Sequence, residues 1–180
     1  PLREIAAQAH ACGAVTVIDN TWATPLYQKP LELGIDYSIH SATKYLGGHS
    51  DVLGGVVLGS EERMDALRGG QRASWGACMD PFAAWLLIRS LRTLEVRMAR
   101  HSASADKVAR FLQEHPRVRS VCYPGLETDE GHTLAQTQMT GYSGLMSFVP
   151  KGTEEQVKKF TQSLHFFQNG CSWGGFESLC

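Results

Sequence analysis

The chain has 180 residues, of which 43% are hydrophobic and 19% are charged. This composition is typical of an ordinary soluble globular protein with one or two domains, and it excludes wholesale disorder. The formal net charge of −1 lacks the basic excess of nucleic-acid binders, and no apolar run approaches the roughly 20 residues of a membrane span.

The first part of the chain alternates helical and strand patterns. Apolar residues at helical spacing predict a helix over residues 2–11, which Gly13 can cap. An apolar, β-branched run over residues 14–18 predicts a strand buried on both faces, as in a parallel sheet, and Asp19 ends it.

A loop with prolines at 25 and 30 follows, and alternating residues then predict a second strand over 35–41. The glycine-rich segment 47–55 predicts a turn, and residues 56–58 resume as a strand. Helix, strand, strand and strand in this order indicate an α/β fold.

The middle of the chain is predicted to be helical. Ser60 is a suitable N-cap for a helix that the glycines at 69–70 are expected to stop. Residues 80–81, Asp-Pro, begin a helical stretch that runs to about Glu114. Because one helix of that length is unusual, we expect a break at 90–93.

The last third predicts strands over 118–123 and 145–149 and a helix over 154–164, which together indicate a smaller α+β unit. We therefore expect two domains, residues 1–100 and a smaller unit at 101–180.

The cysteines and histidines indicate neither a disulfide framework nor a metal site. The five cysteines are scattered without a Cys-x-x-Cys, and the seven histidines form no close pair. We expect buried or incidental thiols in a reducing cytoplasm.

Polar residues of opposite charge follow the first two predicted strands. Asp19 ends the first, and Lys44 follows the second in His-Ser-Ala-Thr-Lys-Tyr, where Ser41 and Thr43 add hydroxyls. Ligands of open α/β sheets bind outside the carboxyl ends of strands, so these groups are expected to share one crevice. Such a set suits pyridoxal phosphate: a lysine forms a Schiff base with its aldehyde, a carboxylate pairs with its pyridinium nitrogen, and hydroxyls bind its phosphate.

Other interpretations of these residues remain open on spacing alone. Asp19 can be a turn former, Lys44 a solvated surface lysine, and the Ser-x-Thr pattern simple turn chemistry. A nucleotide-binding or interaction module of Rossmann-like type is the alternative class, although the chain has no Gly-x-Gly-x-x-Gly fingerprint.

The exact residues resemble the Cys/Met-metabolism family of pyridoxal-phosphate enzymes along the whole chain. The matching stretches are Asp19-Asn-Thr, His40-Ser-Ala-Thr-Lys-Tyr, Gly48-His-Ser-Asp51, Leu91-Arg-Thr-Leu94, Arg97-Met98, His101, His115-Pro116, Tyr123-Pro-Gly-Leu126, Gly144-Leu-Met-Ser-Phe148 and Ser172-Trp-Gly-Gly-Phe-Glu-Ser178. The resemblance implies a fold-type I architecture, a mostly parallel sheet flanked by helices with part of a smaller α+β domain. It also implies a homotetramer built from dimers.

The resemblance assigns roles by position. Lys44 is expected to be the Schiff-base lysine and Asp19 the pyridinium partner. Ser41 and Thr43 are expected to bind the phosphate, and Thr21 to lie against the ring.

Two further positions complete the set that the resemblance implies. Ser172 and Trp173 are expected on the side of the lysine and the substrate carboxylate. The family's cofactor-stacking Tyr, the neighbouring subunit's phosphate contacts and the Arg that clamps the substrate carboxylate fall outside the chain. Since it opens on Pro1 without an initiator Met and ends on Cys180, we expect a part of a longer enzyme that is inactive alone.

Two tryptophans, Trp22 and Trp173, resemble the cystathionine β-lyase branch of the family. We therefore expect β-elimination of cystathionine or cysteine-type amino acids to a thiol, pyruvate and ammonia. The alternative is γ-elimination or γ-replacement, as in the cystathionine γ-lyases, cystathionine γ-synthases, methionine γ-lyases and O-acylhomoserine sulfhydrylases of the family.

Overall fold

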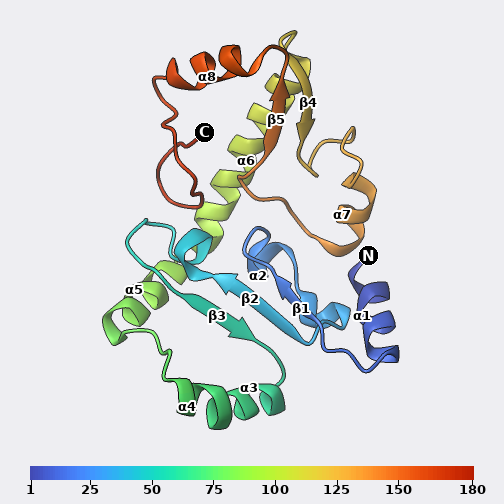
Figure 1. Cartoon of the computed structure of the whole chain (residues 1–180), viewed down its shortest axis with the longest axis vertical. Helices are drawn as coiled ribbons and strands as arrows, with labels where there is room; N and C mark the ends of the chain where they lie inside the picture. Colours follow the sequence, from blue (N-terminus) through green and yellow to red (C-terminus); the bar gives the residue numbers. More distant parts are fainter.

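Two β-sheets organise the chain, and one long helix runs between them (Figure 1). The computed structural model describes all residues 1–180. The strands of the first sheet lie in the order β1 (Val17–Asp19), β2 (Tyr37–Ser41) and β3 (Gly55–Leu58). The second sheet pairs β4 (Val118–Cys122) antiparallel with β5 (Ser147–Pro150).

Helices surround both sheets. They are α1 (Leu2–Ala11), α2 (Thr24–Tyr27), α3 (Glu61–Leu67), α4 (Ala73–Trp75), α5 (Pro81–Leu91), α6 (Leu94–Glu114), α7 (His132–Gln138) and α8 (Glu154–Gln162). Short segments of other helical types are η1 (Pro30–Leu33), a 3-10 helix, and η2 (Ala42–Leu46) and η3 (Arg68–Arg72), which are π-helical. The α/β fold class is confirmed, and no helix is long and apolar enough to cross a membrane.

Several predicted helix boundaries are confirmed because local capping decides them. The Ser60 hydroxyl accepts a hydrogen bond from the Arg63 N–H at 3.3 Å, and the Asp80 carboxylate accepts one from the Phe82 N–H at 2.9 Å. The expected break falls between the end of α5 and Leu94. α6 then ends at Glu114, two residues before Pro116.

The parallel pairing of the first two strands is also confirmed, but their predicted burial is wrong. Val17 lies opposite Tyr37 and Asp19 opposite Ile39, while β3 runs antiparallel to β2. Val15 and Val17 are 58% and 59% exposed, because β1 forms the edge of this sheet. The strand itself covers only Val17–Asp19 of the expected run.

The prediction from glycine and proline was wrong at two places. The glycines at 69–70 do not stop the helix, which continues through η3 and α4 to Gly76, where φ is +67°. Glycine costs a helix only about 1 kcal/mol and therefore weakens it without ending it. The expected loop at 25–30 contains α2 and η1, since proline fits the first turn of a helix. The short helix α7 was not expected.

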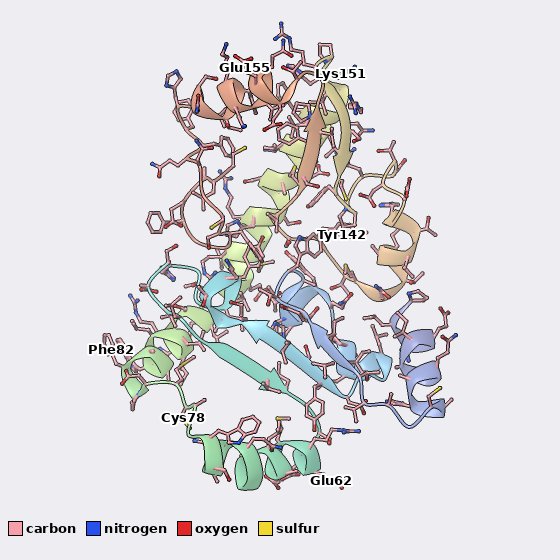
Figure 2. All side chains as sticks on the ribbon, viewed as in Figure 1. Glu62, Cys78, Phe82, Tyr142, Lys151 and Glu155 are labelled. Carbon is pink, nitrogen blue, oxygen red and sulfur yellow. The ribbon has the colours of Figure 1, made fainter.

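Two hydrophobic clusters each contain residues of α6. The first consists of Ala42, Tyr45, Leu46, Leu87, Leu94 and Met98. The second consists of Ala105, Ala109, Tyr123 and Leu126. The change from one cluster to the other on α6 supports our proposal that residues 1–100 and 101–180 are the two structural units. Figure 2 shows Lys151 and Glu155 at the far end of the second part and Glu62 at the opposite end of the molecule.

The five cysteines are all free and exposed, so none of the expected buried or incidental thiols is buried. They make no disulfide in this chain.

A buried carboxylate ties three elements of the first part together. Asp36 has a side chain that is 8% exposed and accepts hydrogen bonds from the Thr16 N–H and hydroxyl, both at 2.8 Å. It also pairs with His10 of α1 at 2.9 Å and with Arg63 of α3. The pKa of this carboxyl lies well below its usual range, first because the Thr16 backbone N–H donates to it, and then because of His10.

We predict that Asp36→Asn lowers the free energy of unfolding by about 2 kcal/mol, the size expected for charge-assisted hydrogen bonds. Because the folded pKa of Asp36 lies below the unfolded value of about 3.9, the carboxylate stabilises the fold above about pH 4 and loses this contribution as the pH falls further. Urea unfolding between pH 3 and pH 7 measures both effects. Asp106→Asn, which removes an exposed pair with Arg110, is the control and should cost at most about 0.5 kcal/mol. Equal losses from the two variants would contradict the prediction.

Candidate active site

The carboxyl ends of β1 and β2 are joined by one threonine. The Thr21 N–H and hydroxyl donate to Asp19 Oδ1 at 2.9 and 2.5 Å, and the same hydroxyl accepts from the Ser41 N–H at 2.7 Å. Thr21 is only 6% exposed, so its hydroxyl has little access to water and is occupied by these two partners. The structure therefore brings Asp19 and Ser41 close together, as the strand pattern predicts, and Thr21 lies between them.

Lys44 lies in the turn that follows β2. This turn is η2, whose backbone departs from helical geometry at Lys44, with φ −89° and ψ −127°. Its start is tied to the residues before β3, because the Ala42 N–H donates to the Gly54 carbonyl at 2.8 Å. The Gly54 N–H in turn donates to the Thr43 hydroxyl at 3.3 Å, which leaves the hydroxyl proton of Thr43 available.

An arginine of α6 supports the far side of this turn. Arg97 Nη1 donates to the Tyr45 carbonyl at 2.7 Å, and Nη2 donates to the Ser90 carbonyl at 3.1 Å. Gly48 has φ +69° and lies so close that an added Cβ would be 2.0 Å from Arg97 Nη1. Only glycine therefore allows the guanidinium to reach the Tyr45 carbonyl along this path.

The C-terminal segment returns to Lys44 from the other end of the chain (red in Figure 1). Lys44 Nζ donates to the Ser172 hydroxyl at 3.0 Å and lies 4.1 Å from the centre of the Trp173 ring. The cation thus has an oxygen acceptor on one side and an aromatic face on another. Ser172 and Trp173 are brought to the lysine, as the resemblance implied for their position.

A buried histidine sits beside the carboxylate. His40 of β2 is 3% exposed, its Nε2 is 3.2 Å from the Ser38 hydroxyl, and its Nδ1 has no hydrogen-bond partner. Burial lowers the pKa of His40, and the negative charge of Asp19 offsets part of this effect. His40 is therefore neutral near pH 7 and adds no positive charge beside Asp19.

The chemistry of this set fits pyridoxal phosphate. Asp19 Oδ2 makes no hydrogen bond within the chain, so one carboxylate oxygen is available to a protonated ring nitrogen. The Ser41 hydroxyl and the Thr43 proton are available donors for a phosphate. Lys44 supplies a primary amino group, whose Nζ donates to the Ser172 hydroxyl.

Sequence reasoning missed the residues that hold the site from behind. Tyr45 is 1% exposed, and its hydroxyl accepts from the Gly144 N–H at 2.9 Å, while Arg97 holds the Tyr45 carbonyl. Both residues lie inside stretches that carry the family resemblance, and this was the available signal. Trp22 Nε1 donates to the Leu145 carbonyl at 3.0 Å, so this tryptophan also joins the two parts of the molecule.

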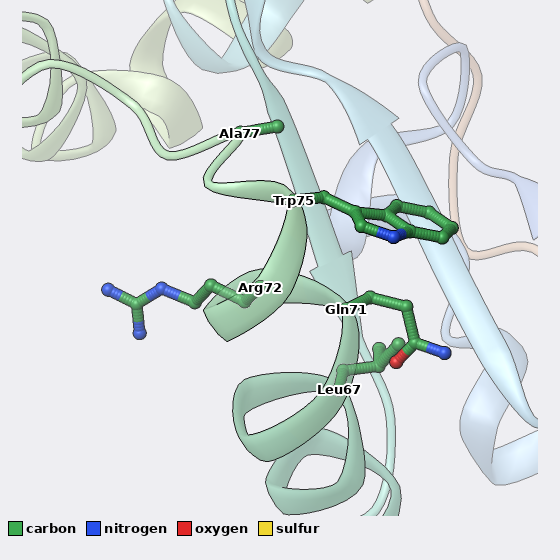
Figure 3. A pocket seen from close by; sticks show the side chains of 5 residues that line it. All are labelled: Leu67, Gln71, Arg72, Trp75 and Ala77. Atoms are coloured by element: carbon green, nitrogen blue, oxygen red, sulfur yellow. The ribbon is translucent and has the colours of Figure 1, made fainter.

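A hollow beside the helical segment that runs from α3 to α4 is separate from the residues around Lys44. Figure 3 shows Leu67, Gln71 and Trp75 projecting to one side of the helical segment that lines it, with Arg72 pointing away. None of the residues near Lys44 lines this hollow.

The chain matches one protein family over nearly its whole length. Residues 2–180 fit the family described as Cys/Met metabolism PLP-dependent enzyme. The cystathionine beta-lyase of Lactococcus lactis subsp. cremoris is 45% identical over 178 residues, which are 99% of this chain and 47% of that protein. The cystathionine gamma-lyase of Bacillus subtilis (strain 168) is 43% identical over 171 residues, which are 95% of this chain and 45% of that protein.

Solved structures agree with this match. The crystal structure of cystathionine gamma synthase from Xanthomonas oryzae pv. oryzae, in complex with aminoacrylate and cysteine, has a TM-score of 0.94 and 43% identity. The alignment covers 99% of this chain and 46% of that one, so the chain spans about half the length of the relatives it matches. The expected fold-type I architecture is confirmed.

We predict that Thr21→Val destabilises the protein by about 1–3 kcal/mol, because the Ser41 N–H loses its acceptor and Asp19 loses a donor. Thr21→Ser keeps the hydroxyl and is the matched control, with a loss below about 1 kcal/mol. Urea unfolding of both variants checks this. A valine variant as stable as the serine variant would show that the bridging hydroxyl contributes nothing.

Proposed function

Because this chain belongs to the family of Cys/Met metabolism PLP-dependent enzymes, we propose that it carries the lysine-bearing part of the active site of a carbon–sulfur lyase. The family implies pyridoxal phosphate as cofactor. The observation that carries the proposal is the contact of Lys44 with Ser172 and Trp173 beside the joined ends of β1 and β2.

The cofactor is held by four side chains in this proposal. Lys44 bonds covalently to its aldehyde, and the Asp19 carboxylate keeps the proton on its ring nitrogen. The Ser41 and Thr43 hydroxyls donate to its phosphate. Thr21 contributes by holding Asp19 Oδ1, while Asp19 Oδ2 makes no hydrogen bond within the chain.

The reaction depends on proton transfer at the substrate's Cα. When bound, pyridoxal phosphate supplies an electron sink for the amino acid attached to it. Lys44 Nζ would act as the general base that removes the Cα proton. The Ser172 hydroxyl, which accepts from Nζ at 3.0 Å, and the Trp173 ring keep the amine near this position.

We propose β-elimination as the specific reaction. The substrate is cystathionine or a cysteine-type amino acid, and the products are a thiol, pyruvate and ammonia. Trp22 and Trp173 support this choice, as does the 45% identity to a protein named cystathionine beta-lyase. The runner-up is γ-elimination or γ-replacement, because a cystathionine gamma-lyase and a cystathionine gamma synthase are each 43% identical.

Membership of the same family is also the basis of our proposal for the oligomeric state and the cellular compartment of the enzyme. We propose that the full-length protein is a homotetramer, a dimer of dimers, and works in the cytoplasm. Five exposed cysteines that form no disulfide support a reducing compartment. Gel filtration with light scattering tests the tetramer.

We predict that borohydride reduction fixes pyridoxal phosphate on Lys44 of the full-length protein, as mass spectrometry of the peptides will show. Lys44→Ala should abolish this label and lower turnover by a factor on the order of 10²–10⁴ or more, because the general base is lost. Lys29→Ala is the control, since Lys29 is exposed and pairs only with Glu32 on the surface. Label on another lysine, or a colourless protein that binds nucleotide, would reject the proposal.

We predict that cystathionine yields pyruvate, homocysteine and ammonia, since β-elimination cleaves the bond between sulfur and the three-carbon moiety. Chromatography of the 2-oxo acids formed measures this directly, with Lys44→Ala as the blank. If 2-oxobutyrate and cysteine appear instead, the enzyme performs γ-elimination.

A further inference from the structure

The C-terminal strap, which we define as residues 172–177, touches the first part of the molecule at two places. Its first residue accepts the hydrogen bond from Lys44, and its last makes a second contact with the loop after η2. There the Ser50 hydroxyl donates to Glu177 Oε2 at 2.7 Å. The two contacts join residues separated by 128 and 127 positions in the sequence.

Two glycines allow the strap to lie directly on the turn that carries Lys44. Gly174 has φ +87°, and a Cβ added there would be 2.6 Å from the Tyr45 nitrogen and 2.8 Å from the Lys44 carbonyl carbon. A Cβ on Gly175 would be 2.2 Å from the Ser50 hydroxyl oxygen and 2.3 Å from Glu177 Oε2. The strap is therefore seated by close backbone contact between its two hydrogen-bonded ends.

The backbone conformation of Ser50 is unusual for a residue with a Cβ atom. It is one of two non-glycine residues in the chain with positive φ, at +56°. This conformation is costly for residues with a Cβ and persists where the surroundings hold it. Its hydroxyl, held in this way, has Glu177 as its hydrogen-bond partner in the structure.

We propose that Glu177 and Ser50 are positioning residues whose hydrogen bond holds the strap against Lys44, so that Ser172 and Trp173 stay at the lysine amine. The inference rests on the proposed function for its catalytic meaning, since Lys44 is the reactive amine only in that proposal. The seating of the strap itself is independent of it.

Cleavage by chymotrypsin measures the seating directly. The bond after Trp173 leads into Gly174, which is buried against Lys44, so it is protected while the strap is seated. Trp75 is 79% exposed and lies outside the strap, so cleavage after it serves as an internal reference. Mass spectrometry of the fragments gives both rates in the same digest of the full-length protein.

We predict that Glu177→Ala and Ser50→Gly each raise the rate of cleavage after Trp173 at least about fivefold, as expected when a charge-assisted hydrogen bond is lost. Ser50→Gly removes the hydroxyl without strain, because glycine adopts positive φ readily. Glu177→Gln keeps an acceptor oxygen and is the matched control, with a rate close to that of the unchanged protein. The double variant should cleave no faster than either single variant, since both remove the same bond.

The same variants test whether the position of the strap affects catalysis. Glu177→Ala and Ser50→Gly should lower kcat for cystathionine, Glu177→Gln should restore it, and the thermal unfolding midpoint should stay unchanged in all three. An unchanged rate after Trp173, an equal increase after Trp75, or a glutamine variant as open as the alanine variant would each overturn the inference. If the strap opens but borohydride labels no Lys44, the proposed function fails while the seating stands, so the two failures are distinguishable.

Discussion

The parallel pairing of β1 with β2 is the constraint on which the candidate site depends. Parallel strands end on the same edge of a sheet, and here those ends carry Asp19 and Ser41. The Thr21 hydroxyl then fixes their spacing by bonding to both. β3 runs antiparallel to β2 and begins opposite Ser41, at Gly55. The turn with Lys44 therefore starts and finishes at this same edge, and this places the lysine there.

Three contacts from later parts of the chain hold this edge. α6 passes from one hydrophobic cluster to the other, and its Arg97 holds the turn from behind. The C-terminal segment then crosses back, so that Ser172 meets the lysine amine. Tyr45 adds a third tie through its hydroxyl and Gly144. Tyr45, which is next to Lys44 in the sequence, is thus hydrogen-bonded to the second unit. A movement between the units would therefore displace the residue beside the lysine.

How much of this the sequence could predict depends on whether the cause is local. Asp19 and Lys44 were predictable because strand ends, hydroxyls and charge lie within a short stretch, and caps such as Asp80 act within one helical turn. The roles of Arg97 and Glu177 were not, since their partners lie 52 and 127 residues away. The glycines at 69–70 misled for the opposite reason. A local preference was taken as decisive where continued hydrogen bonding along the helix outweighed it.

Relatives with nearly equal identity to this chain are named for different reactions. Proteins named as a β-lyase, a γ-lyase and a γ-synthase are 45%, 43% and 43% identical to this chain, so similarity of this size accompanies all three reactions. In the reaction that we propose, removal of the Cα proton needs an amine such as Lys44 and a protonated ring. Elimination at Cβ or Cγ diverges after that step and depends on what contacts the departing group. Trp22 and Trp173, on which our proposal of β-elimination rests, each lie where the C-terminal half of the chain meets the lysine-bearing half. Their packing roles and a part in reaction choice are compatible, since a ring that is fixed by its neighbours presents a defined surface to the substrate.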